Sequence, residues 1–444
     1  MMRVGLGNGQ ACPQAQEVVS WKLKDELVRI RMESRALTKQ GERFLTKISI
    51  SSSSSSHNLI RRFVQGSPKS VVLTTLSHLL SPSTNPHLSP LALPLYTRIT
   101  LAPWFCWNPT TAAHLAALLH QLGHHAQSQT LVSDATSRLQ SSTRQLVLFY
   151  GKLMESHSKR GSLSGFQLAY AYLHKLLCTC SSVYVKRRAY EYMVSGLCAM
   201  DRPGEAEDLA LGLGLGLEPS GFELKFIVYG YGRLGLFEDM RRVVDEMEKG
   251  GFVVDTVCYN MVLSSYGIHG EHEDMVGWLR RMRNSGVPFS VRTYNCVTNC
   301  CPSVMRMGEL HELEGGERML VRELLGCRRI LEEVMLWDSL EVKLDLHGFH
   351  LPAAYLIVLL WLDEMRTRFQ HQVPRQVTLV SGSGNHSTVR GESPVRLLVQ
   401  KMMLKMDSPL KLDRNNNGCF VAKGKPFKNW LCQLRNIPIQ SILI

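Results

Sequence analysis

The sequence of 444 residues lacks any apolar stretch long enough to cross a membrane. Its longest apolar run, from Leu351 to Leu362, is shorter than the roughly 20 residues that a membrane-spanning helix needs. This run predicts a buried helix, and we expect no membrane insertion.

The twelve cysteines lack the two well-spaced pairs that a structural zinc site requires. The clusters that are present read Cys178-x-Cys180 and Cys296-x-x-x-Cys300-Cys301. Because several cysteines fall at apolar positions, we interpret them as reduced core thiols in a reducing compartment. They predict no metal site.

Acidic residues are absent between Glu42 and Asp134. Residues 1–70 are rich in serine and in basic residues, a composition typical of an organellar transit peptide without a fold of its own. The first 42 residues nevertheless contain five acidic residues, which is unusual in a targeting segment. Either the import signal is atypical or the true start lies further in, for example at Met32. We predict that residues 1–70 are a transit peptide or, alternatively, a disordered leader.

The formal net charge of +13 suits a polyanionic partner, which could be nucleic acid or an acidic membrane surface. The length allows two or three domains, and the ordinary composition excludes wholesale disorder.

Residues 222–295 repeat themselves with a period of 35. When residues 231–255 are laid over 266–290, tyrosines, glycines and methionines coincide. The pairs are Tyr231 with Tyr266, Gly232 with Gly267, Gly235 with Gly270, Glu238-Asp239-Met240 with Glu273-Asp274-Met275, Met247 with Met282, and Gly251 with Gly286. A fixed period of this size indicates a stacked array, because one unit cannot bury its apolar face alone. The unit predicts two helices, from about Val257 to Gly267 and from about Glu271 to Asn284.

This unit begins Val-x-Tyr-Asn, carries Tyr-Gly-x-x-Gly between its helices and closes Met-x-x-x-Gly-Val, and it resembles a pentatricopeptide repeat. The alternative, a tetratricopeptide-like repeat, has a period of 34 residues. The resemblance implies a single-stranded RNA partner that is read one base per repeat. It assigns the base contact to Asn260 and Asn295, assisted by the last residue of a repeat, Asp255 or Ser290. Asn260 with Ser290 would favour a pyrimidine. Lys225 holds the corresponding position one repeat earlier and is not a usual base reader.

We predict a helical repeat array over residues 71–305, with clear repeats at about 187–295. Residues 75–185 are helical in pattern but irregularly spaced, so they predict degenerate repeats. Residues 306–338 are rich in Glu, Arg and Leu and predict a helical connector with i,i+4 charge pairs.

The pattern changes at Val342, where apolar and polar residues alternate as in a strand. The order predicted from there is β-α-β-α-β-β, with a right-handed crossover between two parallel strands at 342–346 and 376–380. Asp345 and His347 would then lie beside the loop 381–387, at the edge where open α/β sheets bind ligands.

Two short motifs here resemble those of the small MutS-related (Smr) domain. They are Leu344-Asp345-Leu346-His347 and Gly382-Ser383-Gly384-Asn385-His386-Ser387. Several members of that family cut nucleic acid, whereas others only bind it. As a mechanism for a cutting enzyme, Gly382, Gly384, Ser387 and Arg390 would hold the scissile phosphate. His347 or His386 would move a proton, and Asp345 would orient the imidazole or hold Mg²⁺. A single carboxylate is a poor two-metal site, so a need for Mg²⁺ stays open.

The predicted fold class is therefore mostly α, a pentatricopeptide-type solenoid followed by an α/β Smr domain at residues 339–432 and a tail at 433–444. This architecture is similar to that of plant organellar proteins, which implies a chloroplast or, less favoured, a mitochondrion. The expected function is transcript processing, stability or translation, with a possible RNA endonuclease activity. The alternatives are a non-catalytic RNA- or protein-binding factor and a pure protein scaffold. The sequence identifies no protein partner.

Overall fold

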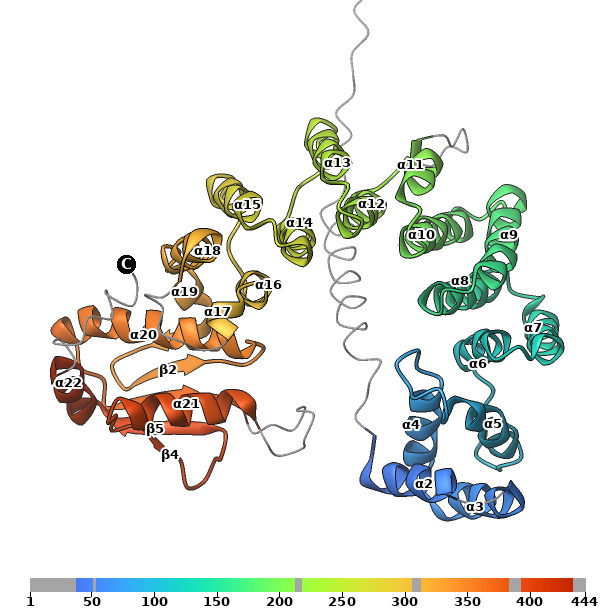
Figure 1. Cartoon of the computed structure of the whole chain (residues 1–444), viewed down its shortest axis with the longest axis horizontal. Helices are drawn as coiled ribbons and strands as arrows, with labels where there is room; N and C mark the ends of the chain where they lie inside the picture. Colours follow the sequence, from blue (N-terminus) through green and yellow to red (C-terminus); the bar gives the residue numbers. More distant parts are fainter. Residues whose placement is uncertain (1–36, 51–52, 212–217, 306–312, 383–392, 434–444) are drawn as a thin grey trace, which may run out of the picture. The chain divides into compact units, whose positions relative to one another are not determined.

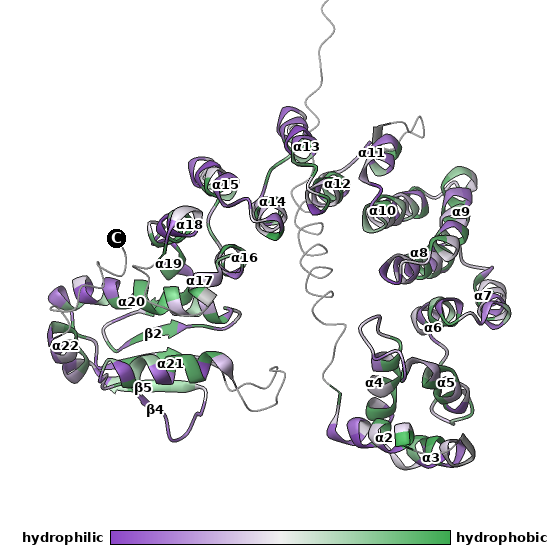
Figure 2. Ribbon diagram, viewed as in Figure 1, coloured by the Kyte–Doolittle hydropathy of each residue, from purple (hydrophilic) through white to green (hydrophobic). Residues whose placement is uncertain are grey.

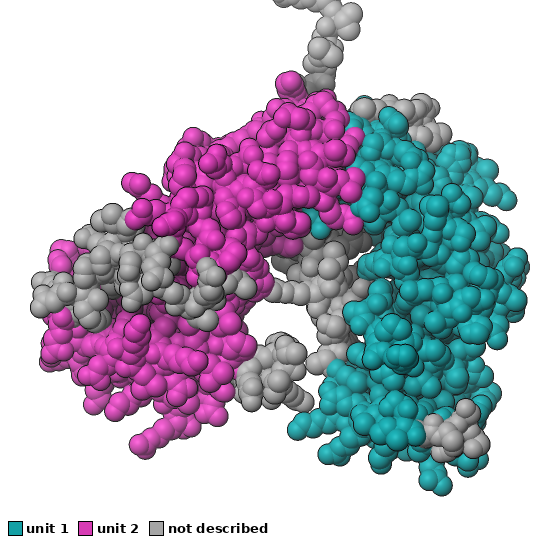
Figure 3. All heavy atoms as spheres, viewed as in Figure 1, with its two compact units in different colours: residues 1–230 teal, residues 231–444 magenta. Residues whose placement is uncertain are grey.

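A computed structural model of the chain describes residues 37–50, 53–211, 218–305, 313–382 and 393–433. The chain forms two compact units, Met1–Gly230 and Tyr231–Ile444, which are described one at a time (Figure 3). Across the described ranges, no helix combines the length and the apolar character needed to cross a membrane.

The first unit begins with a small helical cluster (Figure 1). Its helices are α2 (Lys39–Ile50), α3 (Ser53–Gly66), α4 (Lys69–Leu79) and α5 (Ala92–Thr100), with the 3₁₀ turn η1 (Ser89–Leu91) before α5. Phe44 of α2 stacks on Phe63 of α3 with ring centroids 3.9 Å apart, and both belong to a buried core. Over residues 39–50 and 53–66 the chain is thus helical, where the sequence predicted no fold, because apolar residues such as Phe44 and Phe63 recur at helical spacing and are buried. A targeting role for residues 1–70 stays a prediction.

The first unit continues as pairs of helices joined by short turns. They are α6 (Pro109–Gln121), α7 (His125–Leu139), α8 (Thr143–Lys159), α9 (Leu163–Thr179), α10 (Val183–Ala199), α11 (Pro203–Leu211) and α12 (Gly221–Arg233), the last of which crosses the boundary between the units. Gly123 and Gly161 have positive φ angles of 80° and 64° and allow the turns after α6 and α8. The helices from α6 to α9 agree with the helical pattern expected of residues 75–185.

The second unit begins with the repeats that carry the period of 35. Its helices are α13 (Phe237–Lys249), α14 (Thr256–His269), α15 (His272–Asn284), α16 (Val291–Asn299), α17 (Pro302–Met305), α18 (Gly315–Leu325) and α19 (Ile330–Val334). Gly270 ends α14 in the left-handed conformation, with φ of 77°. Tyr266, Met275 and Met282 are fully buried, so the residues that recur along the chain form the core between helices. The predicted helices of this repeat are confirmed to within a few residues.

An α/β domain follows. Its elements are β1 (Met335–Trp337), β2 (Glu341–Asp345), α20 (Leu351–His371), β3 (Gln376–Val380), α21 (Pro394–Lys405), β4 (Lys411–Leu412), β5 (Cys419–Lys423) and α22 (Gly424–Gln433). The sheet order is β1-β2-β3-β5-β4. The predicted parallel pairing of β2 with β3 is confirmed, with Leu344 opposite Leu379. Two elements were not predicted: β1, which replaces the end of the expected helical connector, and α22.

One face of the sheet holds the core of this domain. Val342, Leu344 and Leu379 are completely buried, and β5 adds Phe420 in register with Leu379. The central part of α20 is hydrophobic where it runs along β2 (Figure 2). An aromatic cluster joins α20 to α22 and consists of Trp361, Phe369, Phe427 and Trp430. The alternate residues Lys343 and Asp345 are only half-buried, as the two-residue period of a strand requires.

Candidate nucleic-acid interface

Asn260 lies in the second turn of α14, and only 4% of its surface is exposed. Its Oδ1 is buried and accepts no hydrogen bond from the described residues. A buried amide oxygen without a donor is uncommon in folded proteins, because losing its bonds to water costs about 1–3 kcal/mol. Asn260 therefore has an unsatisfied acceptor at the position to which the resemblance to a pentatricopeptide repeat assigns base recognition.

Asp255 and Ser290 begin the first helices of consecutive repeats. Asp255 caps α14, and its Oδ1 accepts from the backbone N–H groups of Val257 and Cys258 at 3.1 and 3.0 Å. Ser290 caps α16 through a reciprocal capping box with Thr293. Both predicted base-assisting residues thus fix the start of the helix that carries the asparagine five residues further on.

Asn295 on α16 contacts the α/β domain. Its Nδ2 donates to the carbonyl oxygen of Gly348 at 2.8 Å, and its Oδ1 accepts from the backbone N–H of His350 at 2.8 Å. Both polar atoms of the amide are therefore engaged by the turn between β2 and α20. Asn295 thus holds the α/β domain against the repeats, a contact that was not predicted, and its contact with a base stays a prediction.

Other side chains strengthen this contact between the repeats and the α/β domain. Asn299, one turn after Asn295, lies with its Nδ2 2.9 Å from Nδ1 of His350. Arg328 donates to Asp363 at 2.6 Å and to Glu364 at 2.8 Å, both on α20. Sequence analysis did not identify this set, because its members are far apart along the chain and no local pattern links them.

Lys225 lies on α12, and only 7% of its surface is exposed. Asn260 is buried to a similar degree, so burial alone does not exclude Lys225, and its contact with RNA stays a prediction.

Asp345 and His347 come together at the end of β2. Oδ1 of Asp345 lies 2.6 Å from Nδ1 of His347 and also accepts the backbone N–H of His347 at 2.9 Å. The two side chains remain 46% and 63% exposed, so a phosphate in solvent can reach them. A carboxylate bonded to Nδ1 leaves Nε2 of the imidazole available for proton transfer.

The glycine loop begins beside this pair. Gly382 has a φ of 77°, and a Cβ there would lie 3.3 Å from Nε2 of His347. Glycine therefore lets the backbone approach the imidazole closely. The predicted residues Gly384, His386, Ser387 and Arg390 lie outside the described residues.

The loop is anchored on both sides. Ser381 donates its backbone N–H and its hydroxyl to the carbonyl oxygen of Gly418, at 2.8 and 3.1 Å. The hydroxyl of Ser393, which caps α21, donates to the carbonyl oxygen of Ser381 at 3.1 Å. These bonds bring the two ends of the loop next to the carboxyl ends of β2 and β3.

The sequence leaves a need for Mg²⁺ open at this edge of the sheet. Within the part of the chain that the structure describes, no three His, Cys, Asp or Glu side chains are grouped so that they could hold one. Oδ1 of Asp345 is already engaged by His347. The described donors therefore do not fit a metal centre, and we derive no step through Mg²⁺.

Comparisons with known proteins support the repeat assignment. The PPR repeat family matches residues 226–252 and 257–287. The pentatricopeptide repeat-containing protein At2g17033 of Arabidopsis thaliana is 47% identical over 438 residues, which cover 94% of this chain and 86% of that protein. A second Arabidopsis thaliana protein of this kind, At1g74750, is 38% identical over 60 residues, or 14% of this chain and 7% of its own length.

Two solved structures of the pentatricopeptide repeat protein PPR10 also match. The crystal structure from maize shares 16% identity with a TM-score of 0.34, and the match covers 81% of this chain and 62% of that one. The structure of PPR10 in complex with an 18-nt psaJ RNA element shares 14% identity with a TM-score of 0.26, covering 73% and 47%. This chain thus spans less than two thirds of PPR10, and the assignment rests on the sequence relative. By its identity to At2g17033 over nearly its whole length, the chain belongs to the pentatricopeptide repeat protein family.

Proposed function

We propose that this protein binds single-stranded RNA through its repeats and that Asn260 contacts a base. The observation that carries the proposal is the buried, unsatisfied Oδ1 of Asn260. An amide side chain offers one acceptor and two donors, which suits the edge of a base. Family membership supports the same proposal, since PPR10, another pentatricopeptide repeat protein, forms a complex with an RNA element.

The charge of the chain agrees with this proposal. A formal net charge of +13 favours association with a polyanion and makes the affinity depend on salt. In this proposal the repeats hold the RNA strand in place, and the amide of Asn260 discriminates among bases. Contacts to the RNA backbone alone carry no sequence information.

The test measures binding of the full chain to short fluorescent RNAs that differ at one base, by fluorescence anisotropy. Asn260→Ala should reduce the preference among bases by roughly tenfold, the amount that one or two hydrogen bonds to a base supply. Asn284→Ala is the matched control, because Asn284 is an exposed asparagine at the end of the same repeat. If both variants keep the parent's base preference, Asn260 is not a base reader.

We further propose that the α/β domain is a small MutS-related domain that cleaves RNA. Its support is the Asp345–His347 pair beside Gly382. In this proposal Asp345 accepts Nδ1–H, and Nε2 of His347 takes the proton of an attacking hydroxyl. The oxygen of that hydroxyl bonds to phosphorus, the ester bond to the leaving oxygen breaks, and the leaving oxygen takes a proton from solvent.

Cleavage is tested by incubating the full chain with end-labelled single-stranded RNA, with magnesium or with EDTA. The full chain is required because α2 and α3 contribute to the folded core. His347→Ala should abolish cleavage and leave RNA affinity unchanged, whereas His371→Ala, which removes an exposed histidine of the same domain, should change neither. If the parent binds RNA without cutting it, the domain has an affinity role and the non-catalytic alternative replaces the nuclease.

We also propose that the protein acts on organellar transcripts, with the chloroplast favoured over the mitochondrion. The support is the absence of acidic residues between Glu42 and Asp134, because organellar transit peptides are poor in acidic residues. A carboxyl-terminal fluorescent fusion of the full chain, imaged in plant cells, tests it directly. Signal confined to the cytosol would contradict it.

A further inference from the structure

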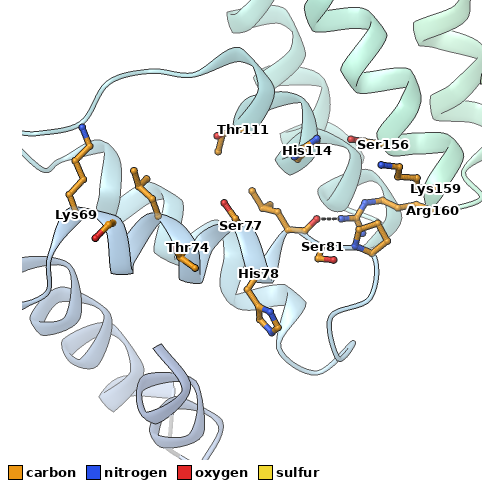
Figure 4. A pocket seen from close by; sticks show the side chains of 14 residues that line it. Lys69, Thr74, Ser77, His78, Ser81, Thr111, His114, Ser156, Lys159 and Arg160 are labelled. Carbon is orange, nitrogen blue, oxygen red and sulfur yellow. Dashed lines mark hydrogen bonds between the residues drawn. The ribbon is translucent and has the colours of Figure 1, made fainter. Parts of the chain in front are cut away.

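A groove in the first unit lies between α4, α6 and the end of α8 (Figure 4). Its volume is about 750 Å³, within the range of small-molecule and cofactor sites. The wall formed by α4 presents residues spaced along one helical face. They are Lys69, Ser70, Leu73, Thr74, Ser77 and His78, and Leu80 and Ser81 follow directly after the helix.

The lining of the groove carries positive charge and hydroxyl groups and includes no acidic residue. Arg160 closes one end beside Lys159, whose Nζ pairs with Oε1 of Glu155 at 2.8 Å, and Lys69 lies at the other end (Figure 4). Hydroxyl groups come from all three walls, for example from Thr74, Thr111 and Ser156. Both α4 and α6 belong to the stretch of sequence without Asp or Glu, so two walls are free of acidic residues by composition.

Arg160 is fixed in place by neutral groups. One Nη donates to Oε1 of Gln121 and the other to the carbonyl oxygen of Leu80, each at 2.6 Å. Its Nε is buried and has no acceptor among the described residues. Burial lowers the pKa of Arg160 to about 10. The guanidinium is therefore a partly buried positive charge that no carboxylate of the described chain pairs with, and a bound anion would offset its desolvation.

The length of the groove indicates the kind of anion. From Lys69 to the end of α4 at Leu79 the helical rise amounts to roughly 15 Å, which exceeds a single phosphate and matches a few nucleotides of an extended strand. Hydroxyl donors between two cationic ends suit the non-bridging oxygens of consecutive phosphates.

We propose that this groove binds consecutive backbone phosphates of a single-stranded nucleic acid. This inference rests on the proposed function, because the strand would be the RNA that the repeats bind. It assigns to the first unit a contact that is independent of base identity and separate from both Asn260 and the Asp345–His347 pair.

The test is the salt dependence of RNA binding by the full chain, measured with a fluorescent uridine dodecamer over a series of potassium chloride concentrations. Each phosphate contact that is lost should lower the slope of log affinity against log salt by about 0.7 for a single strand. Lys69→Met and Arg160→Met should each lower the slope by about this amount and weaken binding about tenfold at low salt. The preference among bases should not change.

Lys175→Met on α9 is the control, because Lys175 is exposed and lies outside the groove. Arg160 also anchors Leu80 and Gln121, so thermal melting must show that Arg160→Met folds. Lys69 and Ser77 are exposed, so Lys69→Met and Ser77→Ala test the groove without that risk.

Two results would overturn the inference, and they are distinguishable. If the parent binds RNA and the groove variants show the same slope of log affinity against log salt as Lys175→Met, the groove is not a phosphate site and the proposed function stands. If the parent binds no RNA at any salt concentration, the proposed function fails together with this inference.

Discussion

Asn260 and Asn295 occupy equivalent positions one period apart, yet their amide oxygens are in opposite hydrogen-bonding states. Oδ1 of Asn260 has no donor among the described residues, whereas Asn295 is bonded through both polar atoms. The partners of Asn295 lie 53 and 55 residues further along the chain. The repeat pattern could predict that both residues share a position, but the use of Asn295 depends on a domain that the pattern does not include.

Replacement of Asn295 by alanine should destabilise the second unit. The change leaves the carbonyl of Gly348 and the N–H of His350 without their partners, which costs about 1–3 kcal/mol. Urea unfolding monitored by tryptophan fluorescence measures the loss, with Asn284→Ala as the control for removal of an exposed asparagine. A variant with unchanged stability and lost base preference would return Asn295 to the role of a base reader.

His157 should make the first unit sensitive to acid. It is 3% exposed, and burial together with the neighbouring charges of His120 and Arg160 lowers its pKa from 6.5 to about 4. Because the folded form binds its proton less readily than the unfolded form, its contribution is fully present above pH 6.5. It is lost as the pH falls from 6.5 to 4, by about 3 kcal/mol in all.

The free energy of unfolding of the parent and of His157→Gln, measured at several values between pH 4 and 7.5, checks this expectation. The variant should lose less stability than the parent across that window. His87→Gln, which replaces an exposed histidine of the same unit, should follow the parent. Parallel curves for the parent and His157→Gln would show that His157 is not the acid-sensitive group.

Among the elements, those with a long periodic pattern could be predicted from sequence. The helices α14 and α15 follow from the 35-residue period, and β2 and β3 from alternation and flanking glycines. The strand β1 was missed because Met335–Trp337 is only three residues long and directly follows a helix. The helices α2 and α3 were missed because the serine run near their junction outweighed the helical spacing of Phe44 and Ile48.

Two glycine replacements should have opposite effects on the helices that contain them. Gly424 begins α22, and a Cβ there would lie 1.7 Å from the carbonyl oxygen of Pro374, so Gly424→Ala should destabilise the domain by about 1–3 kcal/mol. Gly277 lies inside α15 with no atom near the position of a Cβ, so Gly277→Ala should stabilise by about 0.5–1 kcal/mol. Thermal melting of both variants beside the parent measures the two shifts. A gain in stability from Gly424→Ala would contradict the close packing of α22 on the loop before β3.

At the scale of the whole molecule, packing is mainly between helices that are close in sequence, such as α8 with α9 and α8 with α10. Stability in such arrays is approximately a sum over neighbouring units. We therefore expect unfolding in more than one step, with a van't Hoff enthalpy below the calorimetric enthalpy. Differential scanning calorimetry measures both, and equal values would indicate a single cooperative transition.

The hydrogen bonds from Asn295 to Gly348 and His350 also set a limit on engineering. On the proposed function, a designer who wished to retarget the protein to another RNA could vary residue 260, where the amide oxygen has no partner in the described chain. The same exchange at residue 295 would detach the turn that immediately follows His347 from the last repeat. On that proposal, the part of the array that is open to such an exchange ends before α16, the helix that carries Asn295.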